Sequence, residues 1–186
     1  MGSDRIDQCA DFTVFAGACQ LRMLRAAYLV CGDRHLAEDL LQGALIKVAL
    51  RWGQLRNGNP EAYLRVILFR DAVSWRRRMR REVSVADPPD RPGIGHRAPD
   101  QAPDDGNEPT QRRILFAVAL GRLTAKQRAI LVLRYFEDHT EVRTAEILGV
   151  SVGTVKSQTA VALRRLRELA PELSELVHHD DRGGSR

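Results

Sequence analysis

The sequence of 186 residues predicts an all-α protein with two small helical domains joined by a flexible linker. Apolar residues recur at helical spacing on both sides of a proline-rich stretch, and no useful length of strand-like alternation occurs. Six of the eight prolines lie between 87 and 109, where apolar periodicity is lost. Such a segment cannot form a packed core. We therefore predict domains over 1–82 and 112–171, a linker over 83–111 and a polar tail over 172–186.

Basic charge is concentrated in the two predicted domains. The formal net charge is +5, but it is unevenly distributed. Residues 1–82 carry 14 basic and 9 acidic side chains, and residues 112–186 carry 13 and 9. The segment 83–111 carries 2 and 6. Two basic blocks around an acidic spacer suggest two contacts with a polyanion such as nucleic acid.

Several classes of protein are disfavoured by what the sequence lacks. No apolar run approaches the roughly 20 residues that span a bilayer, and the N-terminus lacks the features of a secretory signal. We expect a cytoplasmic protein without membrane contact. Cys9, Cys19 and Cys31 lack paired spacing, so free thiols are a better interpretation than a zinc site completed by His35. No phosphate loop, metal-ligand cluster or nucleophile elbow appears, so we predict no enzyme, catalytic residue, metal, cofactor or small-molecule substrate.

Three helices are predicted in the first domain. The first spans 11–31 with Asp11 as its cap, and the second runs from about 34 to 52 after the N-cap Asp33. A polar loop follows over 53–59, and the Asn59-Pro60-Glu61 sequence starts the third helix. This helix ends with five arginines in the six positions 76–81. The helix dipole accounts for one or two of them, so a phosphate-binding surface is favoured over a merely solvated basic end.

The second domain is predicted to end in a helix-turn-helix motif. A helix over 112–122 comes first, and a capping box from Thr124 to Gln127 opens a helix that runs through Phe136. After a turn over 137–140, a short helix ends at Gly149, and Ser151 caps a longer basic helix over 152–169. In such motifs the second helix enters the DNA major groove. An ordinary antiparallel helix pair is the alternative, but the polar sequence 154–158 at the start of the second helix favours DNA reading.

Three strings together resemble the extracytoplasmic-function (ECF) family of bacterial sigma factors, the dissociable promoter-recognition subunits of RNA polymerase. G-D-R-H-L-A-E-D-L-L-Q, at 32–42, resembles the region 2 helix of that family. L-T-A-K-Q-R-A-I-L-V-L-R-Y-F-E-D, at 123–138, and A-E-I-L-G-V-S-V-G-T-V-K-S-Q-T-A, at 145–160, resemble region 4. The resemblance covers 11–82 and 112–169 and points to the actinobacterial SigE-like group.

The resemblance implies three binding surfaces. Core RNA polymerase, through its clamp helices and flap, is the expected partner of a face formed by Glu38, Asp39, Gln42, Leu45 and Ile46. The −10 promoter element is expected to be opened and held by Asn57, Asn59, Arg70, Trp75, Arg76, Arg77, Arg78, Arg80 and Arg81. The −35 element is expected to be read by Arg134, Thr154, Lys156, Ser157, Gln158, Ala160 and Arg164.

Two positions depart from the family pattern, and the role of Trp75 and the function of the chain each have an alternative interpretation. Trp75 could stack on unpaired bases, worth about 1–3 kcal/mol per base, or simply belong to the core. Gly43 stands where the family usually has an acidic residue, and Arg70 stands where Asn is common. The main alternative function is a helix-turn-helix regulator that works without polymerase. An interaction protein of the anti-sigma type is disfavoured because DNA-reading residues are present, whereas an anti-sigma factor is a candidate partner.

Overall fold

The structure, a computed structural model, describes the backbone of residues 3–83 and 119–169 and the side chains of 9–75 and 119–168. Every regular element in these ranges is helical, as predicted. The first part contains α1 (Ser3–Cys31), α2 (Arg34–Ala49), α3 (Trp52–Leu55) and α4 (Pro60–Val83). The second contains α6 (Ala125–Leu131), the π-helix η1 (Val132–Phe136), α7 (Glu141–Leu148) and α8 (Val152–Leu169). The predicted tail, and the predicted linker apart from its first residue, Val83, lie outside the described residues.

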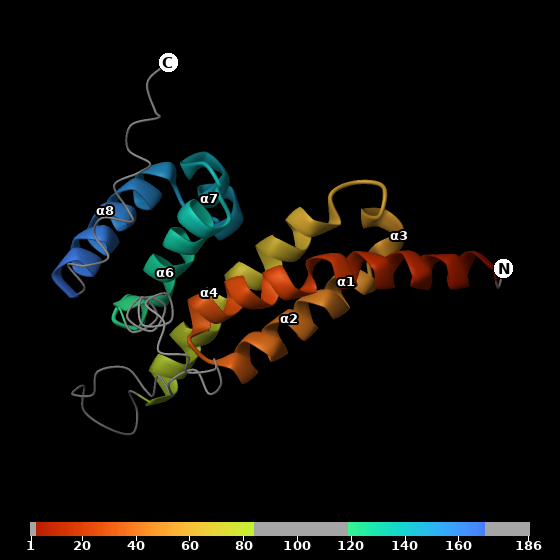
Figure 1. The fold of residues 1–186 in the computed structure, drawn as a ribbon, viewed down its shortest axis with the longest axis horizontal. Coiled ribbons are helices and arrows are strands. Elements are labelled where there is room, and N and C mark those ends of the chain that lie inside the picture. Colours follow the sequence, from red (N-terminus) through yellow and green to blue (C-terminus); the bar gives the residue numbers. More distant parts are fainter. Residues whose placement is uncertain (1–2, 84–118, 170–186) are drawn as a thin grey trace, which may run out of the picture.

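Helices α1, α2 and α4 form an elongated bundle (Figure 1). Their apolar stripes meet in a core in which Met23, Ala44, Leu64 and Leu68 are completely buried. Trp52, only 7% exposed, closes one end of this core, where its ring lies 5.3 Å from Phe12 and 5.1 Å from Phe15. The bundle thus presents α2 and α4 on a rigid scaffold.

The predicted helix starts in the bundle are confirmed at two caps. The Leu36 backbone N–H donates to the Asp33 carboxylate over 2.9 Å, and the Ala62 N–H donates to the Asn59 side chain over 2.9 Å. Two boundary predictions were wrong. Helix α1 begins at Ser3, so Asp11 lies inside it and is not its cap. Helix α2 ends at Ala49, and the packing of Trp52 against α1 starts a new one-turn helix where a loop was predicted.

The expectation that no segment is apolar enough to span a membrane was wrong for α1. By length and composition alone, its stretch Cys9–Cys31 is long and apolar enough to cross a membrane. The physical reason is that one side of this helix is core: Met23, Ala27 and Val30 are buried against neighbouring helices. Arg22 on the same helix forms an ion pair with Glu61 of α4. Packing in the bundle therefore accounts for the apolar residues on that side of α1, whereas Val14 and Leu21 on the same helix are exposed.

The second part begins at a capping box, as predicted. The Gln127 N–H donates to the Thr124 hydroxyl over 3.2 Å, and the Thr124 N–H donates to the Gln127 side chain over 3.1 Å. The helix does not continue regularly to Phe136, however. It widens into η1 from Val132, and the Glu137 N–H donates to the Val132 carbonyl five residues back. Most of the predicted helix over 112–122 lies outside the described residues, of which 119–121 are helical.

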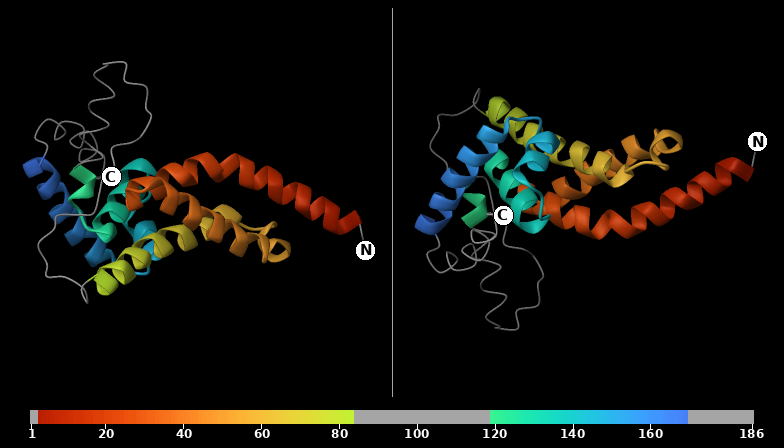
Figure 2. Two further views of the ribbon diagram at one scale, coloured as in Figure 1. Left: turned by 90° about the horizontal axis from the view of Figure 1, so that it is seen from below. Right: turned by 90° about the horizontal axis from the view of Figure 1, so that it is seen from above.

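The two parts pack against each other through a shared core, which we call the seam. It lies at the end of the bundle away from the N-terminus, where α6, η1 and α7 contact α1 and α4 (Figures 1 and 2). The buried residues come from both parts. Those of the first are Ala26, Val30, Cys31, Phe69 and Ala72, and those of the second are Ala129, Val132, Leu133 and Ile147.

Candidate promoter and polymerase interfaces

The turn before α8 sets the start of the candidate DNA-reading helix. Gly149 ends α7 with φ 65° and ψ 43°, the left-handed conformation predicted for it. Ser151 then caps α8, because its hydroxyl accepts from the Thr154 N–H over 3.1 Å. The Thr154 and Ser151 hydroxyls also lie 2.9 Å apart. Thr154, half-buried, is therefore held by the cap.

One face of α8 is open to solvent. Lys156, Ser157, Ala160 and Arg164 are all exposed, and the last three share a face because they are three or four residues apart. The Lys156 ammonium lies 3.7 Å from a carboxylate oxygen of Glu141, and 65% of the Lys156 side chain is exposed. Exposed ion pairs contribute about 0–1 kcal/mol. Lys156 can therefore exchange this partner for an acceptor on DNA at little cost.

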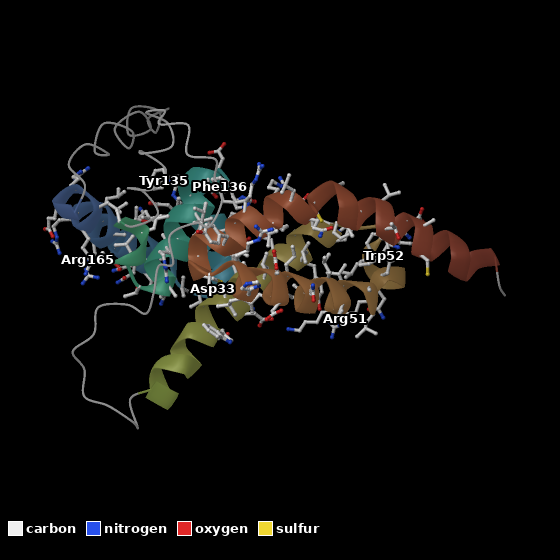
Figure 3. All side chains as sticks on the ribbon, turned by 60° about the horizontal axis from the view of Figure 1, so that its bottom comes forward. Asp33, Arg51, Trp52, Tyr135, Phe136 and Arg165 are labelled. Atoms are coloured by element: carbon white, nitrogen blue, oxygen red, sulfur yellow. The ribbon has the colours of Figure 1, made fainter. Side chains whose placement is uncertain are left out.

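Two predicted −35 residues turn toward the protein. Gln158 is half-buried and accepts a hydrogen bond over 3.1 Å from Gln127 of α6. Arg134, in η1, donates to the His139 carbonyl over 2.5 Å, and its guanidinium carbon lies 5.9 Å from the centre of the exposed Tyr135 ring (Figure 3). Both side chains are partly engaged within the domain.

The residues predicted for the −10 element follow one another along α4 and the loop before it. Asn57 and Asn59 are exposed, and Asn59 uses its side-chain oxygen as the α4 cap. Trp75 is half-buried, and none of the buried core clusters of the described residues includes it. The arginines predicted with them lie on the last turns of α4, where the structure describes the backbone only: Arg76, Arg77, Arg78, Arg80 and Arg81.

Arg70 lies at the seam. Its guanidinium donates to the Ile147 carbonyl over 2.8 Å and to the Glu146 carbonyl over 2.9 Å. These carbonyls belong to the last turn of α7, at the negative end of its dipole, and the Glu146 carbonyl also accepts from the Gly149 N–H over 3.3 Å. Arg70 therefore caps α7 from the other part of the chain, an arrangement that its place in the sequence does not signal. Its predicted −10 role stays a prediction.

The predicted polymerase face lies on the outside of α2. Asp39, Gln42 and Ile46 are exposed, whereas Leu45 packs partly on the bundle core. Glu38 forms an ion pair with Arg34 at 2.9 Å. The sequence reasoning missed Leu50, which is 81% exposed one turn after Ile46, itself 60% exposed. Together they form an exposed apolar pair. A Cβ atom added at Gly43 would have no other atom within 4 Å, so the backbone there leaves room for a side chain to begin.

His139 should make the stability of the protein depend on pH. Burial lowers its pKa below the ordinary value of 6.5, and the nearby Arg65 guanidinium lowers it further. The unfolded chain therefore binds a proton more readily than the folded one. We expect the free energy of unfolding to fall as the pH drops through about 6.5, measured by urea titration between about pH 8 and 3.

His139→Asn is the matched variant for this prediction. It should remove part of the slope near pH 6.5 and leave the acid end of the curve intact. There Glu61 contributes separately: burial raises its pKa, but Arg65 and Arg22 outweigh burial and leave the pKa below 4.5. Its contribution is thus lost only as the pH falls below that value. Identical slopes near pH 6.5 in both proteins would contradict the assignment to His139.

Comparisons with known proteins agree on both parts of the chain. The family model for sigma-70 region 2 matches residues 16–82, and the family model for sigma-70 region 4 matches residues 119–168. The RNA polymerase sigma-E factor of Streptomyces avermitilis is 35% identical over 160 residues, 85% of this chain and 84% of that protein. The ECF RNA polymerase sigma factor SigL of Mycobacterium tuberculosis is 31% identical over 153 residues, 80% and 82% of the two chains.

A solved structure is also similar. It is the sigma factor RpoE of Bartonella quintana, crystallised in complex with the anti-sigma factor NepR. The TM-score is 0.63 at 27% identity, and the match covers 86% of this chain and 96% of that one. The similarity therefore includes both helical parts.

Proposed function

Because the chain belongs to the ECF family of RNA polymerase sigma factors, we propose that it binds core polymerase and directs it to specific promoters. Sigma factors are transcription initiation factors, and we propose no catalytic role for this one. The observation that carries the proposal is the presence of both regions in one chain, with a capped, exposed and basic helix in the second. The cytoplasm, where polymerase works, is its proposed location.

The three surfaces are proposed to divide the task. The exposed side of α2, from Asp39 to Leu50, is the proposed contact with the polymerase clamp helices. The end of α4, from Trp75 through the arginines to Arg81, is proposed to hold the unpaired −10 strand, because aromatic rings stack on bases and cations track the backbone. The exposed face of α8 is proposed to read the −35 element.

An anti-sigma factor is a further proposed partner. The support is that the similar Bartonella chain was crystallised with one. The contact surface for such a partner is not part of this proposal.

Lys156→Ala tests the −35 assignment. At a promoter identified by mapping transcription starts after overexpression, it should lower transcription by purified core polymerase about 5- to 150-fold, the range of one lost contact to DNA of about 1–3 kcal/mol. Transcription by this variant should respond less to base changes in the −35 element of the promoter and should respond as before to base changes in the −10 element. Arg81→Ala should show the reverse pattern, and Arg25→Ala, which removes an exposed cation of α1, should change neither.

Two results would contradict the proposal. Loss of discrimination only at the −35 element in both Lys156→Ala and Arg81→Ala would show that the two-region assignment is wrong. Tight, sequence-specific duplex binding by the free protein, with no effect of core polymerase on transcription, would identify a regulator that works without polymerase.

A further inference from the structure

Gln127 is a buried polar hub that connects α6 to α8. It occupies the third position of α6 and is only 3% exposed. Its side-chain oxygen accepts from the Thr124 N–H over 3.1 Å and from the Arg165 guanidinium over 3.2 Å. Its side-chain nitrogen donates to the Gln158 oxygen over 3.1 Å. Arg165 lies on the side of α8 that is next to α6 (Figure 3).

The chemistry of these partners decides which way both amides point. A backbone N–H and a guanidinium can only donate hydrogen bonds, so the atom of Gln127 that meets both must be its carbonyl oxygen. The amide nitrogen of Gln127 therefore faces Gln158, and it can only donate. Gln158 must then turn its own carbonyl oxygen toward α6. The orientation of both amides thus follows from the network rather than from their shape, which is nearly symmetric.

This orientation directs the amide nitrogen of Gln158 away from α6. Within the described residues its amide nitrogen has neither a hydrogen-bond partner nor a place among the buried atoms that lack one. Gln158 lies next to the exposed Ser157 near the start of α8. The side that it offers outward is therefore a pair of N–H donors. The bidentate contact of Gln with adenine also needs the carbonyl oxygen, which here is held against α6.

We propose that Gln127 is a positioning residue that fixes Gln158 as a hydrogen-bond donor toward promoter DNA. This proposal rests on the proposed function. The group recognised is a hydrogen-bond acceptor. Such acceptors are presented in the major groove by guanine N7 and O6, by adenine N7 and by thymine O4, and along the backbone by phosphate oxygens. Gln127 itself touches no DNA and acts through the orientation of its neighbour.

Gln127→Glu reverses the orientation without removing the hub. Glutamate suits the third position of a capping box, and its carboxylate can still accept from Thr124 and Arg165. A carboxylate cannot donate, however, so Gln158 must turn its nitrogen inward and its carbonyl outward. Transcription by the reconstituted holoenzyme is measured on templates that carry each base at each −35 position.

The two sources of the acceptor give different expected results. If Gln158 meets a base edge, the preference at one position moves toward the bases that present an amino donor there, adenine and cytosine, and away from guanine and thymine, which present only acceptors; the expected change is about 5- to 150-fold, the range of one base contact. If it meets a phosphate, binding weakens equally for all sequences. A changed base preference supports the inferred donor role directly, and uniform weakening supports it only where the weakening depends on Gln158. An unchanged base preference together with unchanged promoter affinity overturns it.

A double-mutant cycle separates orientation from added charge. A new carboxylate near DNA repels phosphates whatever Gln158 does, so Gln127→Glu is repeated in a Gln158→Ala background. Equal effects in both backgrounds overturn the proposal, whereas an effect that largely disappears without Gln158 supports it.

A second variant covers the case in which Gln127→Glu does not fold. Gln158→Glu changes a half-buried residue, keeps an acceptor for Gln127 and offers no donor outward. It should therefore abolish the original base preference or, if the acceptor is a phosphate, weaken binding to all sequences; an unchanged preference together with unchanged promoter affinity overturns the proposal. The failure of this inference differs from failure of the proposed function. In the latter, the wild-type protein itself directs no promoter-specific transcription by core polymerase.

Discussion

Arg65→Ala is expected to lower the free energy of unfolding by about 5 kcal/mol, the upper end of the range for breaking a buried ion pair. The Arg65 guanidinium of α4 lies 3.0 Å from the Glu137 carboxylate after η1, with side chains 8% and 2% exposed. Removal of Arg65 leaves the Glu137 carboxylate buried, with one oxygen already lacking a hydrogen-bond partner in the described part of the chain. An unpaired buried charge costs more than the pair contributed.

Glu137→Ala should be milder, at about 3 kcal/mol, the lower end of the same range. Arg65 keeps a second carboxylate in that variant, since Glu61 lies 2.6 Å away. The order of the two effects is therefore part of the prediction. Urea denaturation of both variants measures it, and the double variant Arg65→Met/Glu137→Leu should recover much of the loss, because an apolar pair leaves no buried charge. Losses below about 1 kcal/mol in both single variants would show that the pair is solvated in solution.

Phe69→Ala should cost about 3–5 kcal/mol through the cavity that it leaves. Phe69 is 1% exposed on α4 and belongs to the shared core of the seam, beside Leu133 and Ile147 of the second part. The loss should appear as a lower urea midpoint, measured by circular dichroism. Truncation of Phe69 removes contacts to both parts at once, so it should weaken their packing as well as the bundle.

Phe136→Ala is the matched control, because it is the same substitution at a residue that is 49% exposed (Figure 3). Surface substitutions usually change stability by no more than about 0.5 kcal/mol. Equal effects of the two substitutions would contradict the seam as a well-packed core.

Much of the local structure could be predicted from the sequence. The caps at Asp33, Asn59 and Ser151, the capping box at Thr124 and the left-handed Gly149 are all where they were predicted. Each of these caps depends on residues three or four positions apart, so a short stretch of sequence is enough to predict it. The exposed face of α8 follows likewise from helical periodicity, which is why the candidate −35 residues Lys156, Ser157 and Ala160 are on one open surface.

Other features escaped sequence reasoning. Nothing local marks the widening of the helix at η1 or the break of α2 before Trp52, because packing against distant helices decides both. The candidate site shows the same limit. Arg70 and Gln158 were both assigned to DNA, and each also has a partner elsewhere in the chain.

The sequence by itself determined the all-helical class, the capped helix starts after Asp33, Asn59, Thr124 and Ser151, and the order of two basic regions around a spacer, because these depend on periodicity, capping and composition. Only the tertiary structure decided that the regions share a core, that Arg65 and Glu137 form a buried pair, and that Gln127 orients Gln158. These contacts join residues 72 and 31 positions apart. A hydrogen bond or a buried charge is defined by distance in space, and sequence separation carries no such distance until the chain has folded.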